Sequence, residues 1–162
     1  MPNPLVWQAG PDEAELVSGL LVEFRDWAGS SWPSAETFLG SVKTLMQDPD
    51  TTFLLVSAGR GAPPAGVCQL RFRLSVWTAA EDCWLEDVYV REHARGTGLG
   101  RTLVDAACEH ARHRGCRRVE LDVNEDNARA MELYRSIGFS PHSKGMSATG
   151  RDVLMGMKLS DR

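Results

Sequence analysis

Several features that would place this chain in a familiar class are missing from its sequence. Its 162 residues contain no internal repeat, no low-complexity segment and no apolar run near the roughly 20 residues of a membrane-spanning helix. The first ten residues also lack the basic stretch and apolar core of a secretory signal. Because apolar residues make up 43% and charged residues 25%, as in ordinary globular domains, we expect one cytoplasmic domain over residues 1–162.

Metal-binding and disulfide patterns are missing too. The chain has four cysteines, at Cys68, Cys83, Cys108 and Cys116. Their spacing is not that of metal ligands and they fall within expected strands and helices, so we expect reduced structural thiols. His110 and His113 lie three residues apart in a predicted helix, beside two arginines, which favours a solvated helix face over a metal site. No metal is therefore expected.

The sequence also has no excess of basic charge, which a general nucleic-acid-binding protein would need. Its net charge is -4, with eight acidic against three basic residues in 1–63 and fourteen against fifteen in 64–162. The acidic excess thus lies in the N-terminal part, where it would attract a cationic partner, although solvated surface charge explains the same skew. We expect neither a nucleic-acid nor a membrane partner.

The most informative stretch is an apolar strand that leads through a glycine-rich turn into a helix. The run Val88 to Val90 favours a strand. Apolar residues recur at helical spacing after the turn, at Leu103, Val104, Ala107, Cys108 and Ala111. Gly96, Gly98 and Gly100 therefore lie at a helix N-terminus, where unpaired N–H groups and the macrodipole favour an anion such as a phosphate.

Two common phosphate-binding motifs do not fit this turn. The dinucleotide fingerprint requires a glycine where this chain has Arg101, and the Gly-Lys-Ser/Thr of a P-loop is absent. The Arg-x-x-Gly-x-Gly pattern of Arg95, Gly98 and Gly100 instead resembles the pyrophosphate loop of the GNAT superfamily of acetyl-CoA-dependent N-acetyltransferases. That resemblance is sharp from Trp84 to Phe139 and implies acetyl-CoA as the co-substrate.

The resemblance also implies roles for individual residues of this stretch. The pantetheine is expected to pair like an extra strand with Val88 and Val90, and the N–H of Val88 to stabilise the oxyanion. The implied cofactor-binding residues of the turn and the helix start are Arg95, Gly96, Gly98, Leu99, Gly100 and Arg101. Arg95 and Arg101 would supply positive charge, although a solvated first-turn residue is the alternative for Arg101.

A second motif follows, in which an alternating strand leads into another helix. Asn124 or Asp126 is expected to cap this helix, and Gly138 to end it. Asn127 and Tyr134 are seven residues apart, which puts both side chains on one helix face. By resemblance both are cofactor-binding residues, and Tyr134 is also the catalytic acid that protonates the departing thiolate.

A candidate base lies just before the glycine-rich turn. Glu86 sits in an otherwise apolar strand, where partial burial would raise its pKa. The triplet Leu85-Glu86-Asp87 resembles the polyamine acetyltransferase branch, in which the matching glutamate is the general base. A solvent-facing strand carboxylate is the alternative. In the preceding strand, Gln69, Arg71 and Arg73 alternate with apolar residues and are expected to meet water or a neighbouring chain.

The order of expected elements is βααβββαβαββ, which is the GNAT order. It implies an α/β (α+β) fold with a mixed, mostly antiparallel sheet of about seven strands and helices on both faces. The last two strands are expected at Phe139–His142 and Val153–Leu159. Trp27 and Trp32, around the first helix connection, belong either to the core or to the acceptor site.

These features predict acetyl transfer from acetyl-CoA to a primary amine by direct attack in a ternary complex. The leading acceptor is a small cationic amine, polyamine- or diamine-like, drawn toward Glu23, Asp26 and Glu36. One alternative is a protein N-terminal or lysine acetyltransferase, because the motif from Asn127 to Phe139 belongs to the cofactor half. Another is a non-catalytic acyl-CoA-binding module. A homodimer is expected by family likeness alone.

Overall fold

The computed structural model describes residues 2–124 and 126–140 of the chain. The chain divides into two compact units, Met1–Asn124 and Glu125–Arg162, and each is described by itself. A single domain over residues 1–162 stays a prediction. Among the described residues, no helix has both the length and the apolar character needed to cross a membrane.

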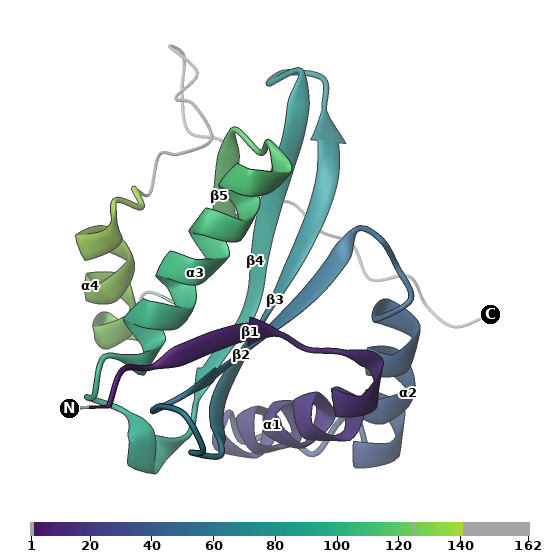
Figure 1. Ribbon diagram of the computed structural model, residues 1–162, viewed down its shortest axis with the longest axis vertical. Coiled ribbons are helices and arrows are strands. Elements are labelled where there is room, and N and C mark those ends of the chain that lie inside the picture. The colour runs from purple at the N-terminus through teal and green to yellow at the C-terminus, as the bar shows by residue number, and fades with distance from the viewer. Residues whose placement is uncertain (1, 125, 141–162) are drawn as a thin grey trace. The chain divides into compact units, whose positions relative to one another are not determined.

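The first unit is built on a five-stranded sheet in the order β1-β2-β3-β4-β5 (Figure 1). The strands are β1 (Leu5–Gln8), β2 (Thr51–Ser57), β3 (Pro64–Ser75), β4 (Ala80–Val90) and β5 (Arg118–Leu121). The first three pairs are antiparallel and β4 pairs with β5 in parallel, so the sheet is mixed and mostly antiparallel, as the sequence predicted. All residues of β2 are buried, with an apolar run from Phe53 to Val56 at its centre, which places the core at this strand.

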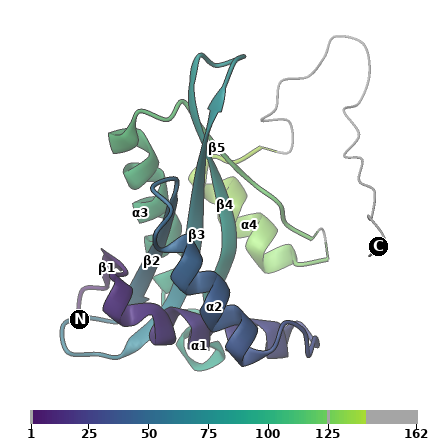
Figure 2. The same ribbon diagram turned by 90° about the vertical axis from the view of Figure 1, so that its right-hand side faces the viewer.

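Helices cover both faces of this sheet, also as predicted. Helices α1 (Ala14–Trp27) and α2 (Ala35–Leu45) lie on one face and α3 (Leu99–Arg114) lies on the other (Figure 2). Short 3-10 helices, Pro11–Glu13 and Glu92–Ala94, precede α1 and α3. The Ser34 hydroxyl accepts the N–H of Thr37 and so starts α2.

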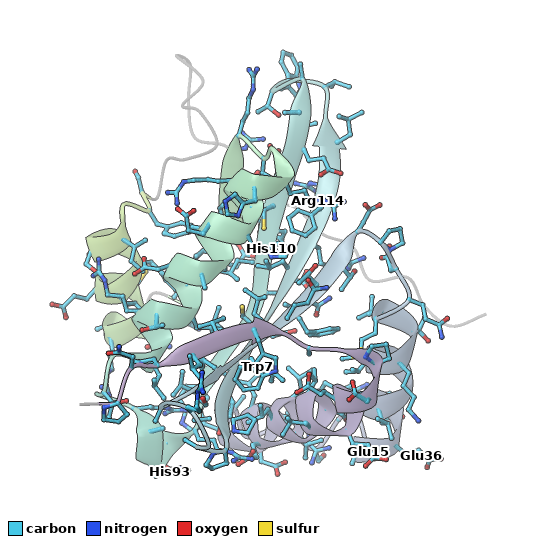
Figure 3. The ribbon with its side chains drawn as sticks, in the orientation of Figure 1. Trp7, Glu15, Glu36, His93, His110 and Arg114 are labelled. Carbon is cyan, nitrogen blue, oxygen red and sulfur yellow. The ribbon has the colours of Figure 1, made fainter. Side chains whose placement is uncertain are left out.

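The strand register shows which face each side chain belongs to. Phe53 packs in one core cluster with Val17 of α1, and it pairs with Gln69, which pairs in turn with Glu86. This row therefore lies on the face under α1 and α2, which we call the α1/α2 face. The opposite face is the one on which His110 and Arg114 of α3 contact the ring of Phe72 (Figure 3).

The predicted seven strands and the full order βααβββαβαββ are not matched. The described residues hold five strands, in the order βααβββαβα with two 3-10 helices added. Phe139, expected to begin a strand, instead donates its N–H to the Tyr134 carbonyl at 3.0 Å and closes helix α4 (Ala128–Ile137). The rest of that strand, and Val153–Leu159, lie outside the described residues.

Helix α4 also corrects the predicted cap. Asn127, rather than Asn124 or Asp126, is the N-cap residue, because it directly precedes the helix and its Oδ1 accepts the N–H of Ala130 at 3.2 Å. Gly138 ends the helix in the left-handed region, with φ of 120°, as predicted.

Three smaller predictions are also tested. All four cysteines are free thiols, as expected. The core alternative for Trp27 and Trp32 is wrong, because their exposed fractions are 53% and 70%. His110 does not lie on a fully solvated face: it is half-buried against Phe72, and burial together with the charges of Arg114 and His113 lowers its pKa.

Candidate active site

The N-terminus of α3 has the features of an anion site. Gly98 caps the helix in the left-handed region, with φ of 86°, and a Cβ built on it would meet no atom within 4 Å. Among the described residues, no side chain caps this end and no acidic residue lies in its first turn. The first N–H groups of the helix thus have no side-chain cap among the described residues, the space beside Gly98 is open, and with the macrodipole this end favours an anion.

The adjoining strand β4 offers a free edge beside this helix end. It pairs with β5 only from Asp82 to Leu85, and within residues 2–124 no strand pairs with it on that side beyond Leu85. Apart from the Val90 carbonyl, which Arg95 engages, the carbonyl and N–H groups of Glu86 to Val90 that point to this side are thus available to an extended ligand.

A bulge interrupts β4 at the start of this free edge. Val67 pairs with Tyr89 but Gln69 pairs with Glu86, so Asp87 and Val88 together oppose one residue of β3. Asp87 adopts φ of 54°, the left-handed region that non-glycine residues seldom enter. The bulge turns the backbone at Val88, where the resemblance implied the oxyanion-stabilising N–H.

The last residue of β4 directs its backbone to the same edge. The N–H of Arg91 donates to the Ala65 carbonyl at 2.8 Å, and the polar groups of neighbouring residues alternate in direction, so those of Val90 point away from β3. Nε of Arg95 donates to the Val90 carbonyl at 2.9 Å. The Val90 N–H is therefore free to donate to an extended ligand, whereas the Val90 carbonyl already accepts a hydrogen bond from Arg95.

Arg95 and Arg101 differ in how they lie. The Arg95 guanidinium is 4.7 Å from the ring centroid of Trp27 and 5.6 Å from that of Tyr89, so its charge rests on aromatic faces. Arg101 lies in the first turn of α3, 3.6 Å from Asp105. Their roles at a phosphate stay predictions.

Glu86 has the altered acidity that a catalytic base needs. The residue is half-buried, and burial, together with the neighbouring charge of Asp87, raises the pKa of its carboxyl, while Arg71 opposes this. This direction is the one the sequence predicted. The role as base stays a prediction.

In the second unit, the end of α4 fixes the ring of Tyr134. The N–H groups of Gly138 and Phe139 both donate to the Tyr134 carbonyl, and the Phe139 ring meets the Tyr134 ring edge-on, 5.8 Å between centroids. Asn127 begins the same helix, two turns earlier on the same side. Asn127 and Tyr134 thus lie on one helix in the second unit. In the first unit, Glu86, Val88 and Val90 lie on the strand that leads to the glycine turn.

The family model described as the acetyltransferase (GNAT) family matches residues 20–139, about three quarters of the chain. The chain belongs to the GNAT acetyltransferase family. Mycothiol acetyltransferase of Beutenbergia cavernae is 39% identical over 97 residues, 58% of this chain and 30% of that protein. Thialysine N-epsilon-acetyltransferase of Bos taurus is 35% identical over 80 residues, 46% of each chain. The chain thus spans less than half the length of these two relatives.

A solved structure supports the same assignment at the level of the fold. The crystal structure of a probable acetyltransferase superimposes with a TM-score of 0.82, covering 96% of this chain and 99% of that one, at 22% identity. At this identity the likeness shows the GNAT fold alone.

The residues of this GNAT chain fit acetyl-CoA. The open space above Gly98 and the uncapped N-terminus of α3 suit its pyrophosphate, and the free edge of β4 suits its pantetheine. Within residues 2–124 and 126–140, no three His, Cys, Asp or Glu side chains gather where they could hold a metal ion.

The bulge at Asp87 and the place of two residues of β3 escaped the sequence analysis. Asp87 was named only as part of the triplet before the turn, although aspartate is disfavoured in strands. Gln69 and Arg71 were expected to meet water or a neighbouring chain. Arg71 is exposed, whereas Gln69 is only 5% exposed, and on the α1/α2 face Gln69 pairs with Glu86 and Arg71 lies one row further along. The strand alternation could have paired them with Glu86 once the register was known.

Proposed function

We propose that the protein transfers the acetyl group of acetyl-CoA to the primary amine of a small molecule, by direct attack in a ternary complex. The observation that carries this proposal is the juxtaposition, in a GNAT chain, of the uncapped, glycine-started N-terminus of α3 with the bulged free edge of β4. Acetyl-CoA supplies an activated acetyl thioester.

The chain's own residues supply the proton transfers and the charge stabilisation. An alkylamine has a pKa near 10.4, so it arrives as an ammonium ion, and Glu86 takes its proton. The Val88 N–H, turned by the bulge, donates to the carbonyl oxygen as it gains negative charge. Tyr134 gives its phenolic proton to the departing sulfur.

The acceptor is less closely defined than the reaction. The polyamine-like hypothesis depended on Glu23, Asp26 and Glu36, but Arg91 donates to Glu23 at 2.9 Å and Arg25 pairs with Asp26 at 2.7 Å. Two of these three charges are thus balanced locally, which weakens the attraction for a dication. We therefore propose a small primary amine and keep the dication as a hypothesis to test.

An acceptor screen with acetyl-CoA tests the proposal through the release of CoA thiol. The panel holds diamines, monoamines, amino acids and N-terminal peptides of ribosomal proteins. We expect thiol release with small amines. Release with peptides alone would replace the proposal by a protein acetyltransferase, and tight CoA binding without release would replace it by an acyl-CoA-binding module.

Assembly is still an expectation from the family likeness, and the cytoplasmic location is still an expectation from the sequence. We expect a homodimer in the cytoplasm, and light scattering at several protein concentrations measures the first directly. A monomeric mass throughout would remove the dimer without touching the proposed reaction.

A further inference from the structure

Two polar residues of β3 share the α1/α2 face with Glu86. Gln69 lies directly across from Glu86 in the strand pairing, and Arg71 lies one row further along, across from Trp84. Diagonal neighbours in an antiparallel pair are about 7–8 Å apart at Cα, within reach of long side chains. Gln69, Arg71 and Glu86 can therefore touch one small molecule.

The side chains of Gln69 and Arg71 have no partner among the residues that the structure describes. Gln69 is 5% exposed, yet its amide makes no hydrogen bond with any residue of 2–124 or 126–140. The amide atoms of Gln69 are not among the fully buried polar atoms that lack a partner, so the amide reaches solvent and is free to donate to a ligand. Arg71 is exposed and likewise has neither a hydrogen bond nor an ion pair to the described residues.

Arg71 shares this state with Arg60 and Arg73, but it differs from the arginines of the first unit that form ion pairs with described residues. Carboxylates hold Arg25, Arg91, Arg114 and Arg118 at 2.6 to 2.9 Å. Arg71 is close enough to lower the pKa of both Glu86 and Asp48, but its guanidinium lies beyond ion-pair distance from either. Its donors thus remain for a ligand beside the proposed base.

We propose that Arg71 and Gln69 bind an anionic group, a carboxylate or a phosphate, on the same small molecule whose primary amine is delivered to Glu86. The inference deepens the proposed amine acetylation and rests on it. A guanidinium fork matches the oxygens of either anion, and the Gln69 amide adds one more donor. Trp84, across from Arg71 on the same face, forms a wall beside the anion.

The expected acceptors therefore differ from polyamines. Arg71 attracts an amine that carries a distant negative charge and repels one that carries a second positive charge. The order of preference is an ω-amino acid or an amino sugar phosphate first, the uncharged analogue second and the diamine last.

The test compares acceptors of matched length with the full-length protein and acetyl-CoA. Aminohexanoate, its amide and diaminohexane form the carboxylate arm, and glucosamine 6-phosphate with glucosamine forms the phosphate arm. In at least one arm we expect kcat/KM for the anion to exceed that of its neutral analogue by about 10- to 100-fold, mostly through KM. The arm with the larger ratio identifies the source of the anion.

Variants of β3 separate this role from a structural one. Arg71→Gln is expected to bring the anion-to-neutral ratio close to one, and Arg71→Lys to restore part of it, because a point charge replaces the fork. Arg73→Gln is the matched control: Arg73 is an exposed arginine on the same strand and face, one row further from Glu86. It should keep the wild-type ratio.

Failure of this inference is distinct from failure of the proposed function. Turnover of amines with equal kcat/KM for anionic and neutral members, or an unchanged ratio in Arg71→Gln, overturns the anion site alone. If no amine is turned over, titration of the CoA-bound protein with aminohexanoate and glucosamine 6-phosphate by NMR decides. Binding that weakens in Arg71→Gln but not in Arg73→Gln supports the anion site, and absence of binding overturns it.

Discussion

Helix α3 begins and ends at glycines of nearly the same conformation, but its two ends are finished in opposite ways. Gly98 has φ of 86° and Gly115 has φ of 90°, and a Cβ on either would meet open space. At the C-terminal end, Gly115 and Cys116 donate N–H groups to carbonyls of the last turn, and Arg114 is tied to other segments. At the other end, no described side chain caps the helix.

This difference teaches how a structural glycine is told from a functional one. Both glycines adopt the left-handed backbone conformation, so conformation alone does not distinguish their roles. What separates them is whether the protein satisfies the polar groups that the helix end leaves over. The C-terminal end is complete by itself, whereas the N-terminal end leaves N–H groups for an anion.

The largest expected effect is on CoA affinity, and it should differ between the two glycines at the ends of α3. Gly98→Val should weaken CoA binding by about 10²- to 10⁴-fold, because a branched side chain blocks the space where two or more charge-assisted hydrogen bonds would form. Gly115→Val should leave CoA affinity unchanged. Calorimetry with CoA on both folded variants measures this.

Both valine variants should lose a similar free energy of unfolding, about 1–2 kcal/mol, because each forces a side chain into the left-handed region. Urea denaturation gives that control. Undiminished CoA affinity in Gly98→Val would mean that the two ends of α3 are equivalent and that the glycine turn is only a junction.

The next largest effect separates cofactor binding from catalysis. Tyr134→Phe should lower kcat by about 10²-fold while CoA affinity changes little, since the phenolic proton is needed only as the thiolate leaves. The Phe side chain keeps the ring contact with Phe139, so the helix end should stay intact. Single-turnover rates with any acceptor that releases thiol provide the measurement, and a near-wild-type rate would make Tyr134 structural.

Much of the fold could be predicted because it depends on local patterns. Alternation set the strands, helical spacing set α3, and glycine marked the ends of α3 and α4. The cap of α4 was misplaced by a few residues, because Asn124, Asp126 and Asn127 are equally good caps and only the backbone chooses among them.

The site was predictable where a residue acts through its own type and position in a motif. Glu86 has the raised pKa that its apolar surroundings suggested. Arg95 also belongs to a motif, the Arg-x-x-Gly-x-Gly pattern. Its contacts with Trp27 and Tyr89 could not be predicted, because they depend on how α1 packs against β4. The row of Gln69 and Arg71 likewise depends on strand register, which a bulge shifts.

A smaller effect concerns the bulged segment next to the N-terminal end of α3. In the wild type, kcat/KM should rise about tenfold per pH unit until the raised pKa of Glu86 is passed, since only the carboxylate accepts a proton. Glu86→Gln should lack this rise, and the remaining pH dependence would be that of the amine itself. Asp87→Asn is the neighbouring control and should keep the Glu86 step; identical profiles for wild type and Glu86→Gln would exclude Glu86 as the base.

The smallest effect belongs to the C-terminal end of α3 and should touch stability alone. Arg114 donates to Glu81 and Asp50, each at 2.6 Å, and lies 4.0 Å from the Phe72 ring centroid, so Arg114→Gln should cost about 1–2 kcal/mol in unfolding free energy. Arg112→Gln, which loses one exposed pair with Glu109, should cost a few tenths at most.

The pH dependence of the stability lost in Arg114→Gln shows whether the ion pair with Glu81 is its source. The hydrogen bond from Arg114 lowers the pKa of Glu81 below its ordinary 4.5, so the unfolded chain takes up that proton at a higher pH than the folded one. The stability that the pair contributes is therefore complete above pH 4.5 and disappears as the pH falls through the lowered value. Urea denaturation of wild type and Arg114→Gln should thus give curves that differ at neutral pH and converge in acid, with equal CoA affinity throughout. A loss of CoA affinity in Arg114→Gln would show that the two ends of α3 are coupled.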